Sequence, residues 1–511
     1  MIERKAPFID EQSFDINDIA QLNTLLIGSS GTGKSHSVIG SDIMQANDSY
    51  VVNDPTGKLY KQYGGFLESM GYNVKCFNLK NINKSDYYNP LVYIKNERDV
   101  VVFVSILLQK EITDPIEIEQ ASEDSLWTNS RTMFLHALVA YLCLHGTNIE
   151  KNISGLIQLI KAADIYENDY TDLSQLDLLF AKAEKEEGET SAVKNYKKFK
   201  HSSKNTQKAV IISCTALFQK FEDKAAKIIG TDTLKLDRIG EEKTALFIIN
   251  PTPDTEFCSL VSMLYSHIFD SLYGYCEYTA KYCACIVDES NNVLKTFRAQ
   301  DEEDAKNALD KAESFLSQTR NGKVISNKKE KRWEILTEND ELAGYRGSKK
   351  LADEALSELK AGRVVHNSDL SKRGNRLPVH VRFLLGEFAN TKKIPYFTKI
   401  ITTLRGLNMS VMISLQSMHQ LAAMYEDEDD QYIITRNCDC TICLGGYIDT
   451  ETSDWIFKIV SRRKDNNISA ANIRSVPASK CIVITPTCVS IKTKCVAEEH
   501  PNWKLIKINN I

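Results

Sequence analysis

The residues best suited to chemistry stand near the start of the chain, in the run Gly28-Ser29-Ser30-Gly31-Thr32-Gly33-Lys34-Ser35. Glycines and a lysine at this spacing are typical of a phosphate-binding loop, whose backbone N–H groups curl around the phosphates of a nucleotide. Lys34 is expected to reach the β- and γ-phosphates, and the Ser35 hydroxyl is expected to ligate Mg²⁺. The run therefore predicts a site for ATP and Mg²⁺.

Together with this loop, three further polar residues compose the expected site of a hydrolase. The apolar strand 383–385 ends at Gly386-Glu387, and a phosphate-binding loop needs an acidic group at the end of another strand to organise the Mg²⁺ shell and polarise the attacking water. Arg405 carries a planar guanidinium, which suits charge developing on a transferring phosphoryl group. Gln416 ends the buried strand 411–415, where an amide can sense the γ-phosphate or orient water.

Two of these residues also have a plainer interpretation. Glu387 can be a solvated carboxylate at a strand end, and Arg405 can be a surface salt-bridge residue. We favour the catalytic interpretation because the strand before Glu387 is aliphatic and because the residues occur together with a complete phosphate-binding loop. The hypothesis is that Glu387 acts as the general base.

The elements around these residues alternate between strand and helix. The loop follows the apolar run 25–27 and precedes a helical pattern from His36 onward, and the same alternation returns after residue 371. Such alternation is typical of parallel α/β units. The sequence therefore predicts an α/β fold, a P-loop NTPase with a central, mostly parallel sheet.

Two segments interrupt this pattern. Helical periods dominate 96–237, which we interpret as an inserted all-helical domain, and 280–370 shows a weak duplication in which a hairpin with an Asn/Asp turn is followed by a helix. The basic run 328–332 between the two copies is interpreted as a solvated linker in preference to a contact with a phosphate backbone. The expected domains are 1–95, 238–279 and 371–511 for the nucleotide-binding domain, 96–237 for the helical insert and 280–370 for a small α+β insert.

Composition sets few further limits. The 511 residues carry a net charge of −5, so no global basic field indicates nucleic acid, although a local basic lining would be invisible in this sum. The 13 cysteines without a secretory signal indicate reduced thiols in a cytosol. The cluster Cys438-x-Cys440-x-x-Cys443 is interpreted as a strand in preference to a metal site. No apolar run approaches the ~18–20 residues of a membrane helix.

Several motifs together resemble one family. In order and spacing the chain is similar to the coupling-protein ATPases of type IV secretion and conjugation, the TraG-like group, especially in conjugative elements of Gram-positive bacteria. The matching runs are GSSGTGKS at 28–35, VVNDPTGKLY at 51–60, the FN and YNP elements around Phe77 and Asn89-Pro90, KTALFIINPTPDT at 243–255, RLPVHVRFLLGEFAN at 376–390, TTLRGLNMSVMISLQSMHQL at 402–421, RNCDCTICLGG at 436–446 and HPNW at 500–503.

The resemblance implies a RecA-like P-loop NTPase, a motor that forms a homo-hexameric ring. Such a motor recruits single-stranded DNA and its relaxase to a type IV secretion channel and drives transfer by ATP hydrolysis. Arg405 matches the arginine finger of the family, which acts on the nucleotide of the neighbouring subunit. The helical insert resembles the domain thought to face the cytoplasm and select cargo. The implied location is cytoplasmic, at the inner face of the cell membrane.

Three positions depart from the family pattern. Gly386 stands where the family usually has an aspartate, which predicts weaker Mg²⁺ affinity and reduced turnover that Gly386→Asp would restore. Asp54-Pro55-Thr56-Gly57-Lys58 replaces the usual Asp-Pro-Lys-Gly-Glu. Only 27 residues precede Gly28 and none of them could span a bilayer, so we expect membrane attachment only through a missing anchor or a partner.

Two other functions stay open at this point. The chain can be a catalytically degenerate, ATP-binding docking protein for conjugation cargo, an interpretation that Gly386 favours. It can also be a DNA pump of the segregation or packaging kind, although the DPTGK and FLLGEFAN runs fit that group poorly. Hydrolysis of ATP stimulated by single-stranded DNA would distinguish the motor from the docking protein.

Overall fold

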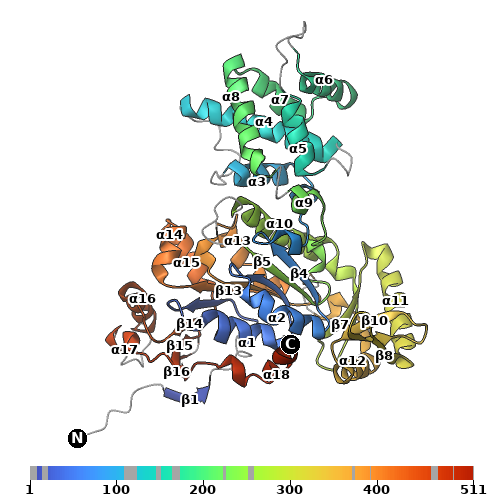
Figure 1. The fold of residues 1–511 in the computed structure, drawn as a ribbon, viewed down its shortest axis with the longest axis vertical. Helices are drawn as coiled ribbons and strands as arrows, with labels where there is room; N and C mark the ends of the chain where they lie inside the picture. Colours follow the sequence, from blue (N-terminus) through green and yellow to red (C-terminus); the bar gives the residue numbers. More distant parts are fainter. Residues whose placement is uncertain are drawn as a thin grey trace. The chain divides into compact units, whose positions relative to one another are not determined.

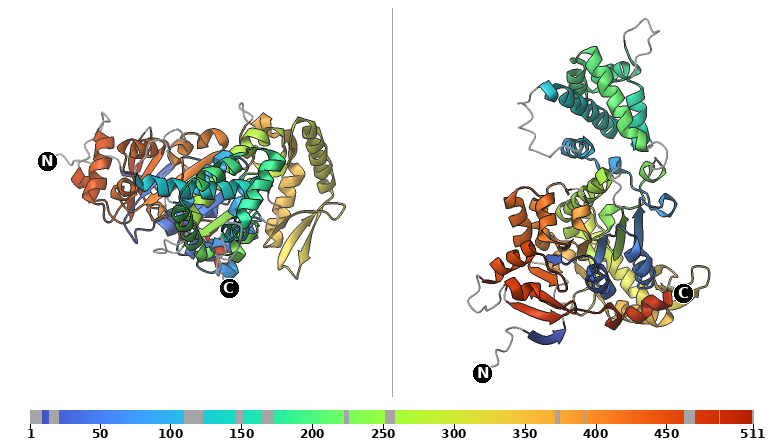
Figure 2. Two further views of the ribbon diagram at one scale, coloured as in Figure 1. Left: turned by 90° about the horizontal axis from the view of Figure 1, so that it is seen from above. Right: turned by 60° about the vertical axis from the view of Figure 1, so that its left-hand side comes forward.

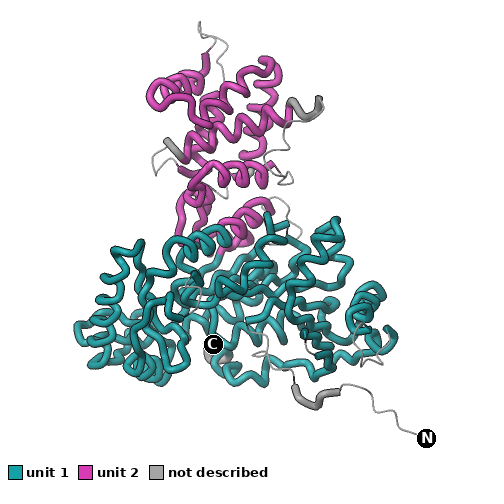
Figure 3. Tube along the Cα trace, turned by 180° about the vertical axis from the view of Figure 1, so that it is seen from behind, with its two compact units in different colours: residues 1–76, 236–252, 268–511 teal, residues 77–235, 253–267 magenta. Residues whose placement is uncertain are grey.

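The computed structural model describes residues 9–13, 21–108, 123–145, 151–163, 173–221, 226–250, 258–370, 375–391, 393–461, 470–486 and 488–509. The chain divides into two compact units (Figure 3). Unit 1 comprises residues 1–76, 236–252 and 268–511, and unit 2 comprises residues 77–235 and 253–267.

A ten-stranded sheet forms the centre of unit 1 (Figure 1). Its strand order is β1-β16-β15-β14-β2-β13-β12-β3-β5-β4. The strands from β14 through β5 are parallel, whereas β15 runs antiparallel to both of its neighbours. This confirms the predicted α/β fold with a mostly parallel sheet. The strands are β1 (Ile9–Ser13), β2 (Thr24–Ile27), β3 (Ser49–Asn53), β4 (Asn73–Asn78), β5 (Thr244–Ile249), β12 (Val381–Leu385), β13 (Met409–Leu415), β14 (Cys440–Leu444), β15 (Lys480–Ile484) and β16 (Val489–Thr493).

Both faces of this sheet are covered, because its central strands are buried at every position and successive side chains point to opposite faces. Leu384 packs in a core that includes side chains of α1 (Gly40–Gln45) and α2 (Lys58–Ser69). Its neighbour Phe383 instead stacks on Phe269 of α10 (Cys258–Tyr278), with ring centroids 4.5 Å apart. The sequence around Cys440 and Cys443 forms β14, as predicted.

Within 280–370 the same order of elements occurs twice. Each copy is a hairpin, a helix and a further strand: β6 (Ala284–Val287), β7 (Val293–Phe297), α11 (Glu302–Arg320) and β8 (Lys323–Asn327), then β9 (Arg332–Leu336), β10 (Leu342–Arg346), α12 (Lys349–Ala361) and β11 (Arg363–His366). The two hairpin turns place Asn291 and Asp340 at φ 66° and 61°. The last strand of each copy pairs with the first strand of the other, which gives two three-stranded sheets, β10-β9-β8 and β11-β6-β7.

The basic run between the copies forms a tight turn. Lys328 to Lys331 form the tight turn of the β8–β9 hairpin, and Arg332 begins β9. The Asn327 side chain accepts hydrogen bonds from the backbone N–H groups of Lys329 and Glu330, both at 3.1 Å, which fixes the turn. The run is therefore exposed to solvent and connects the two copies, as expected, and the Asn327 acceptor closes it into a tight turn that the sequence analysis did not predict.

Unit 2 is helical over most of its described residues (Figures 1 and 2). Aromatic pairs hold its core, with Phe180 stacked on Tyr196 at 4.1 Å and Phe134 packed on Phe199 at 4.5 Å between ring centroids. Its helices include α3 (Glu97–Leu108), α4 (Glu123–His145), α5 (Ile153–Lys161), α6 (Gln175–Glu187), α7 (Ser191–Lys200), α8 (Lys204–Lys220) and α9 (Ala226–Gly230). No helix in the described ranges combines the length and apolar character needed to cross a bilayer.

Candidate nucleotide-binding site

The loop after β2 has the backbone geometry of a phosphate cradle. Gly31 and Gly33 adopt φ of 79° and 95°, a left-handed conformation that glycine enters without steric cost. The helix that follows opens as a π-helical segment (Lys34–Ile39) and continues as α1. Because the N–H groups at a helix start lack partners within the helix, this end attracts anions. The loop therefore fits the phosphates of a nucleotide.

Lys34 is folded against its own loop. Its Nζ donates hydrogen bonds to the carbonyl oxygens of Gly28 and Ser29, the latter at 3.0 Å. Burial lowers the pKa of Lys34, and the nearby carboxylate of Glu387 partly offsets this effect. The electrostatic interaction places Glu387 close to the ammonium group that the sequence assigned to the phosphates.

Glu387 lies directly beyond the end of β12 in a constrained conformation. Its backbone adopts φ 50° and ψ 47°, which is uncommon for a residue with a side chain. The Asn390 side chain donates a hydrogen bond to Glu387 Oε2 at 2.9 Å, and the Asn390 backbone N–H bonds to the Glu387 carbonyl at the same distance. Asn390 thus holds the carboxylate in place, a role that sequence reasoning missed.

Gln416 stands between Lys34 and Glu387 in strand order. It follows β13, which pairs in parallel with both β2 and β12. The Gly28 N–H donates to the carbonyl of Leu415 at 3.1 Å, so the start of the phosphate loop is bonded to the residue before Gln416. The carboxyl ends of three adjacent parallel strands therefore carry the loop, Gln416 and Glu387 at one edge of the sheet.

Arg405 lies at the opposite edge. It belongs to a short 3₁₀ helix (Leu404–Leu407) that precedes β13, and its guanidinium lies 3.4 Å from the carboxylate of Asp439, which precedes β14. The two edges are formed by the two ends of the parallel strands, and the four-residue strand β2 by itself separates them by roughly 13 Å. The Arg405 side chain is 71% exposed, so it is available to another molecule and distant from the phosphate loop of its own chain.

The strand end that holds Glu387 has no room for the aspartate of the family pattern. A Cβ on Gly386 would lie 2.8 Å from the backbone carbonyl oxygen of Asn53, which cannot move away as a side chain can. Asp54 does not replace the missing carboxylate, because it accepts hydrogen bonds from the Tyr60 N–H at 2.9 Å and the Thr56 hydroxyl at 3.2 Å. Ser35, which is exposed, is the residue of this loop that fits a Mg²⁺ ligand.

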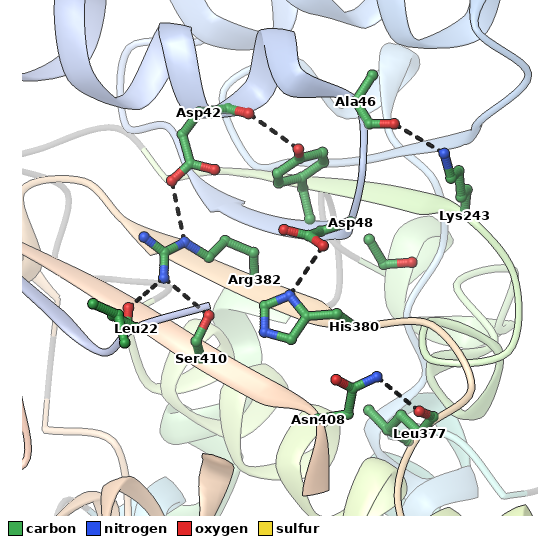
Figure 4. Close-up of polar contacts among 12 residues, drawn as sticks. Leu22, Asp42, Ala46, Asp48, Lys243, Leu377, His380, Arg382, Asn408 and Ser410 are labelled. Atoms are coloured by element: carbon green, nitrogen blue, oxygen red, sulfur yellow. Dashed lines mark hydrogen bonds and ion pairs between the residues drawn. The ribbon is translucent and has the colours of Figure 1, made fainter. Parts of the chain in front are cut away.

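A buried charge network fixes the helix of the phosphate loop to the sheet (Figure 4). Arg382, fully buried in β12, pairs with Asp42 of α1 at 3.1 Å and donates to the hydroxyl of Ser410 in β13 at 2.9 Å. Near it, His380 Nδ1 lies 3.1 Å from the Asp48 carboxylate, and Lys243 donates to the Ala46 carbonyl at 3.0 Å. The helix is thereby tied to the strand that ends at Glu387.

The C-terminal segment also contacts the loop, which sequence reasoning missed except for noting the HPNW run. Lys494 donates to the Thr32 carbonyl at 2.9 Å. His36 lies 2.9 Å from the Glu498 carboxylate and packs edge-on against Trp503. These partners are more than 450 residues from the loop, so no local pattern could reveal them.

Comparison with known proteins gives one consistent answer. A family model described as type IV secretory system conjugative DNA transfer matches residues 6–292, and one described as the TraM recognition site of TraD and TraG matches residues 380–476. No curated protein gives a significant match.

Solved structures share the fold at low identity. The plasmid coupling protein TrwB with a non-hydrolysable ATP analogue matches with a TM-score of 0.54 and 12% identity, over 96% of each chain. TrwB with ADP and Mg²⁺ matches with a TM-score of 0.51 and 13% identity, over 97% of this chain and 90% of the other. The unbound bacterial conjugative coupling protein TrwBdeltaN70 matches with a TM-score of 0.51 and 13% identity, over 95% and 88%.

Proposed function

The chain belongs to the type IV secretory system conjugative DNA transfer family, and from this premise we propose that it is a coupling ATPase that drives the transfer of conjugation substrate. The observation that carries the proposal is the convergence of Lys34, Gln416 and Glu387 at the carboxyl ends of three adjacent strands. Ligands bind characteristically at this edge of open α/β sheets.

In this proposal the loop residues bind ATP and Mg²⁺. The backbone N–H groups of Gly31 to Ser35 hold the phosphates, and Lys34 exchanges its contacts with the Gly28 and Ser29 carbonyls for the β- and γ-phosphates. Ser35 ligates Mg²⁺, which neutralises phosphate charge when bound. The solved relatives named above were crystallised with ADP and Mg²⁺ and with an ATP analogue, which supports this choice of ligands.

Glu387 and Gln416 act on the attacking water. Glu387 accepts the water proton at its carboxylate, and Asn390 keeps that carboxylate oriented. Gln416, at the end of the strand between them, orients the same water or senses the γ-phosphate.

Arg405 completes the site of a neighbouring copy. Arg405 lies at the sheet edge opposite the phosphate loop of its own chain and therefore does not reach it. Its side chain is exposed, and a head-to-tail assembly would bring the Arg405 edge of one copy against the phosphate-loop edge of the next. Such heterologous contacts close into rings, and we propose a hexamer. The guanidinium of Arg405 would then neutralise charge on the transferring phosphoryl group.

The substrate in this proposal is single-stranded DNA with its relaxase, delivered to a type IV secretion channel. The family description supports transfer of DNA in conjugation. We further propose that the helical unit selects the cargo, and that the motor works in the cytoplasm at the inner face of the membrane, attached through a partner or an anchor.

Steady-state ATP hydrolysis with and without single-stranded DNA tests the proposal. We expect hydrolysis by the wild-type chain that rises when single-stranded DNA is added. Glu387→Gln should bind ATP normally but lower turnover by about 100-fold or more, since a general base contributes about 10²–10⁴ in rate. Glu426→Gln removes an exposed carboxylate on the same unit and should leave turnover unchanged.

The same measurement judges the docking-protein alternative. Tight ATP binding without hydrolysis, unaffected by DNA, would establish the degenerate function and overturn the motor. Turnover that does not change in Glu387→Gln would show that another group activates the water.

A further inference from the structure

A polar cavity of about 290 Å³ lies in unit 1 at the sheet edge opposite the phosphate loop. Two edge strands of the duplicated insert, β7 and β10, line it, together with α12 and the residues that precede β5. The insert is fixed in place there, because the Tyr345 hydroxyl donates to the Tyr72 carbonyl at 3.0 Å and the Gly347 N–H donates to the Ser69 carbonyl at 2.8 Å. The volume of the cavity is near the lower end of the range for ligand pockets, about 300–1,000 Å³.

Three cationic side chains converge on this cavity. Lys295 in β7, Arg346 at the end of β10 and Lys243 before β5 all line it. None of the three belongs to an ion pair with another described residue. Lys295 Nζ lies over the ring of Phe315 at 4.1 Å, and Arg346 donates to the Tyr345 carbonyl at 2.7 Å, so each retains donors for a further partner.

The positively charged groups at the cavity repel one another. Burial lowers the pKa of Lys243, and the next largest cause is the neighbouring charge of Arg346. Burial also lowers the pKa of Lys295 and of Arg346. Three carboxylates line the cavity. Glu241 is buried but is paired with Arg238 at 2.8 Å and lies 3.5 Å from Arg298, and Glu242 and Glu358 are on exposed residues, so solvent weakens their compensation. An anion in the cavity would relieve this repulsion.

We propose that this cavity binds a small phosphate-bearing molecule of about the size of a nucleoside monophosphate, with its phosphate between Lys295 and Arg346. A guanidinium and an ammonium are the usual recognition groups for phosphate. The site is separate from the phosphate loop, which lies at the other edge of the sheet. It makes the duplicated insert a ligand-sensing module of the motor.

The cavity is also connected to the helix of the phosphate loop. Lys243 lines the cavity and donates to the carbonyl of Ala46, the residue that caps α1 (Figure 4). A ligand that draws Lys243 toward its phosphate therefore acts on the far end of the helix whose start forms the ATP site. This contact gives the ligand a physical route to ATP affinity.

AMP is the probe for the test. Binding of AMP to the full chain is measured with Mg²⁺ and a saturating non-hydrolysable ATP analogue present, so that the phosphate loop is filled. We expect saturable binding of AMP that inorganic phosphate displaces and adenosine does not. Lys295→Ala and Arg346→Ala should each weaken it about tenfold, as expected for loss of one charge-assisted hydrogen bond. Glu358→Gln should tighten it about threefold by removing a like charge.

Lys360→Ala is the matched control, because this exposed lysine lies on α12 outside the cavity lining. Glu358 is exposed, so its variant keeps the fold even if a cavity cation proves necessary for stability. Absence of AMP and phosphate binding, equal affinity in all variants, or displacement of AMP by a single-stranded DNA oligonucleotide would overturn the proposal. Because the readout is binding, a chain that fails to hydrolyse ATP gives the same titration, so the two proposals fail separately.

Discussion

Asn53 and Gly386 bind the ends of two neighbouring strands to one another. The Asn53 side-chain amide donates a hydrogen bond to the carbonyl oxygen of Gly386, and the Asn53 carbonyl oxygen lies 2.8 Å from the position that a Cβ on residue 386 would take. The glycine before Glu387 is therefore required by the close approach of β3 to β12. The close approach of the two strands therefore accounts for a glycine at position 386 where the family pattern has an aspartate.

The first prediction concerns Gly386. Gly386→Ala and Gly386→Asp should both lower the free energy of unfolding by about 1–3 kcal/mol, because the new Cβ forces the two strand ends apart. Neither should raise ATP turnover, contrary to the gain that sequence alone suggested for the aspartate. Thermal melting and steady-state hydrolysis of the two variants check this. A stable Gly386→Asp variant with faster turnover would show that the strand end can open.

The second prediction concerns the buried pair of Arg382 and Asp42. Arg382→Met leaves the Asp42 carboxylate buried without its partner and should lower the free energy of unfolding by about 3–5 kcal/mol. Adding Asp42→Leu should recover much of the loss. Urea unfolding measures both. Arg320→Met, at an exposed position at the end of α11, is the control and should change stability by less than about 0.5 kcal/mol. Equal stability of the single and double variants would contradict this account.

Much of the fold was predictable because its signals are local. The apolar run before Gly28, the glycine spacing of the loop and the Asn/Asp turns at residues 291 and 340 each specify geometry within a few residues. Glu387 and Gln416 were predictable because parallel strands bring their carboxyl ends to one edge.

The remaining features depend on contacts across hundreds of residues. The pairing of Asn53 with Gly386, the contact of Lys494 with Thr32, and the exchange of last strands within the insert have no signature in sequence spacing. The hairpin turn at residues 328–331 was not predicted, because a basic run is expected to be exposed to solvent both in a tight turn and in an extended segment. Only the acceptor at Asn327 decides between the two.

The third prediction is a pH dependence in unit 2. His267 is buried with its Nδ1 2.7 Å from the Tyr88 hydroxyl, and burial lowers the pKa of His267 from 6.5 to about 3. Below pH 6.5 the unfolded chain therefore binds a proton at His267, whereas the folded protein keeps this imidazole neutral. The free energy of unfolding is highest above pH 6.5 and decreases as the pH falls toward 3. The expected slope is about 1.4 kcal/mol per pH unit below 6.5.

Unfolding measured from pH 7.5 to 5 tests this slope. His267→Gln should flatten it by that amount, whereas His419→Gln, with a side chain 76% exposed, should leave the slope unchanged. Equal slopes in wild type and His267→Gln would mean that the imidazole becomes protonated in the folded state.

The fourth prediction concerns Lys494. Lys494→Met keeps the apolar stem but removes the donor to the Thr32 carbonyl, so the phosphate loop should lose order before ATP binds. We expect ATP affinity to fall about fivefold, equivalent to one ordinary hydrogen bond, with a smaller change in kcat. Lys504→Met removes an exposed lysine from the same segment and serves as the control. If KM for ATP is unchanged in Lys494→Met, the C-terminal segment does not support the loop.

The central claim is that one hydrolytic site is built from two copies of the chain, with Glu387 from one and Arg405 from the next. Arg405→Ala and Glu387→Gln should each lower hydrolysis by about 100-fold or more when assembled alone. Mixed in equal amounts, they should regain activity, because about a quarter of randomly formed interfaces then pair an intact Glu387 with an intact Arg405. Steady-state hydrolysis of the mixture is the measurement. Activity that stays at the level of the separate variants, in assemblies of normal size, would contradict the shared site.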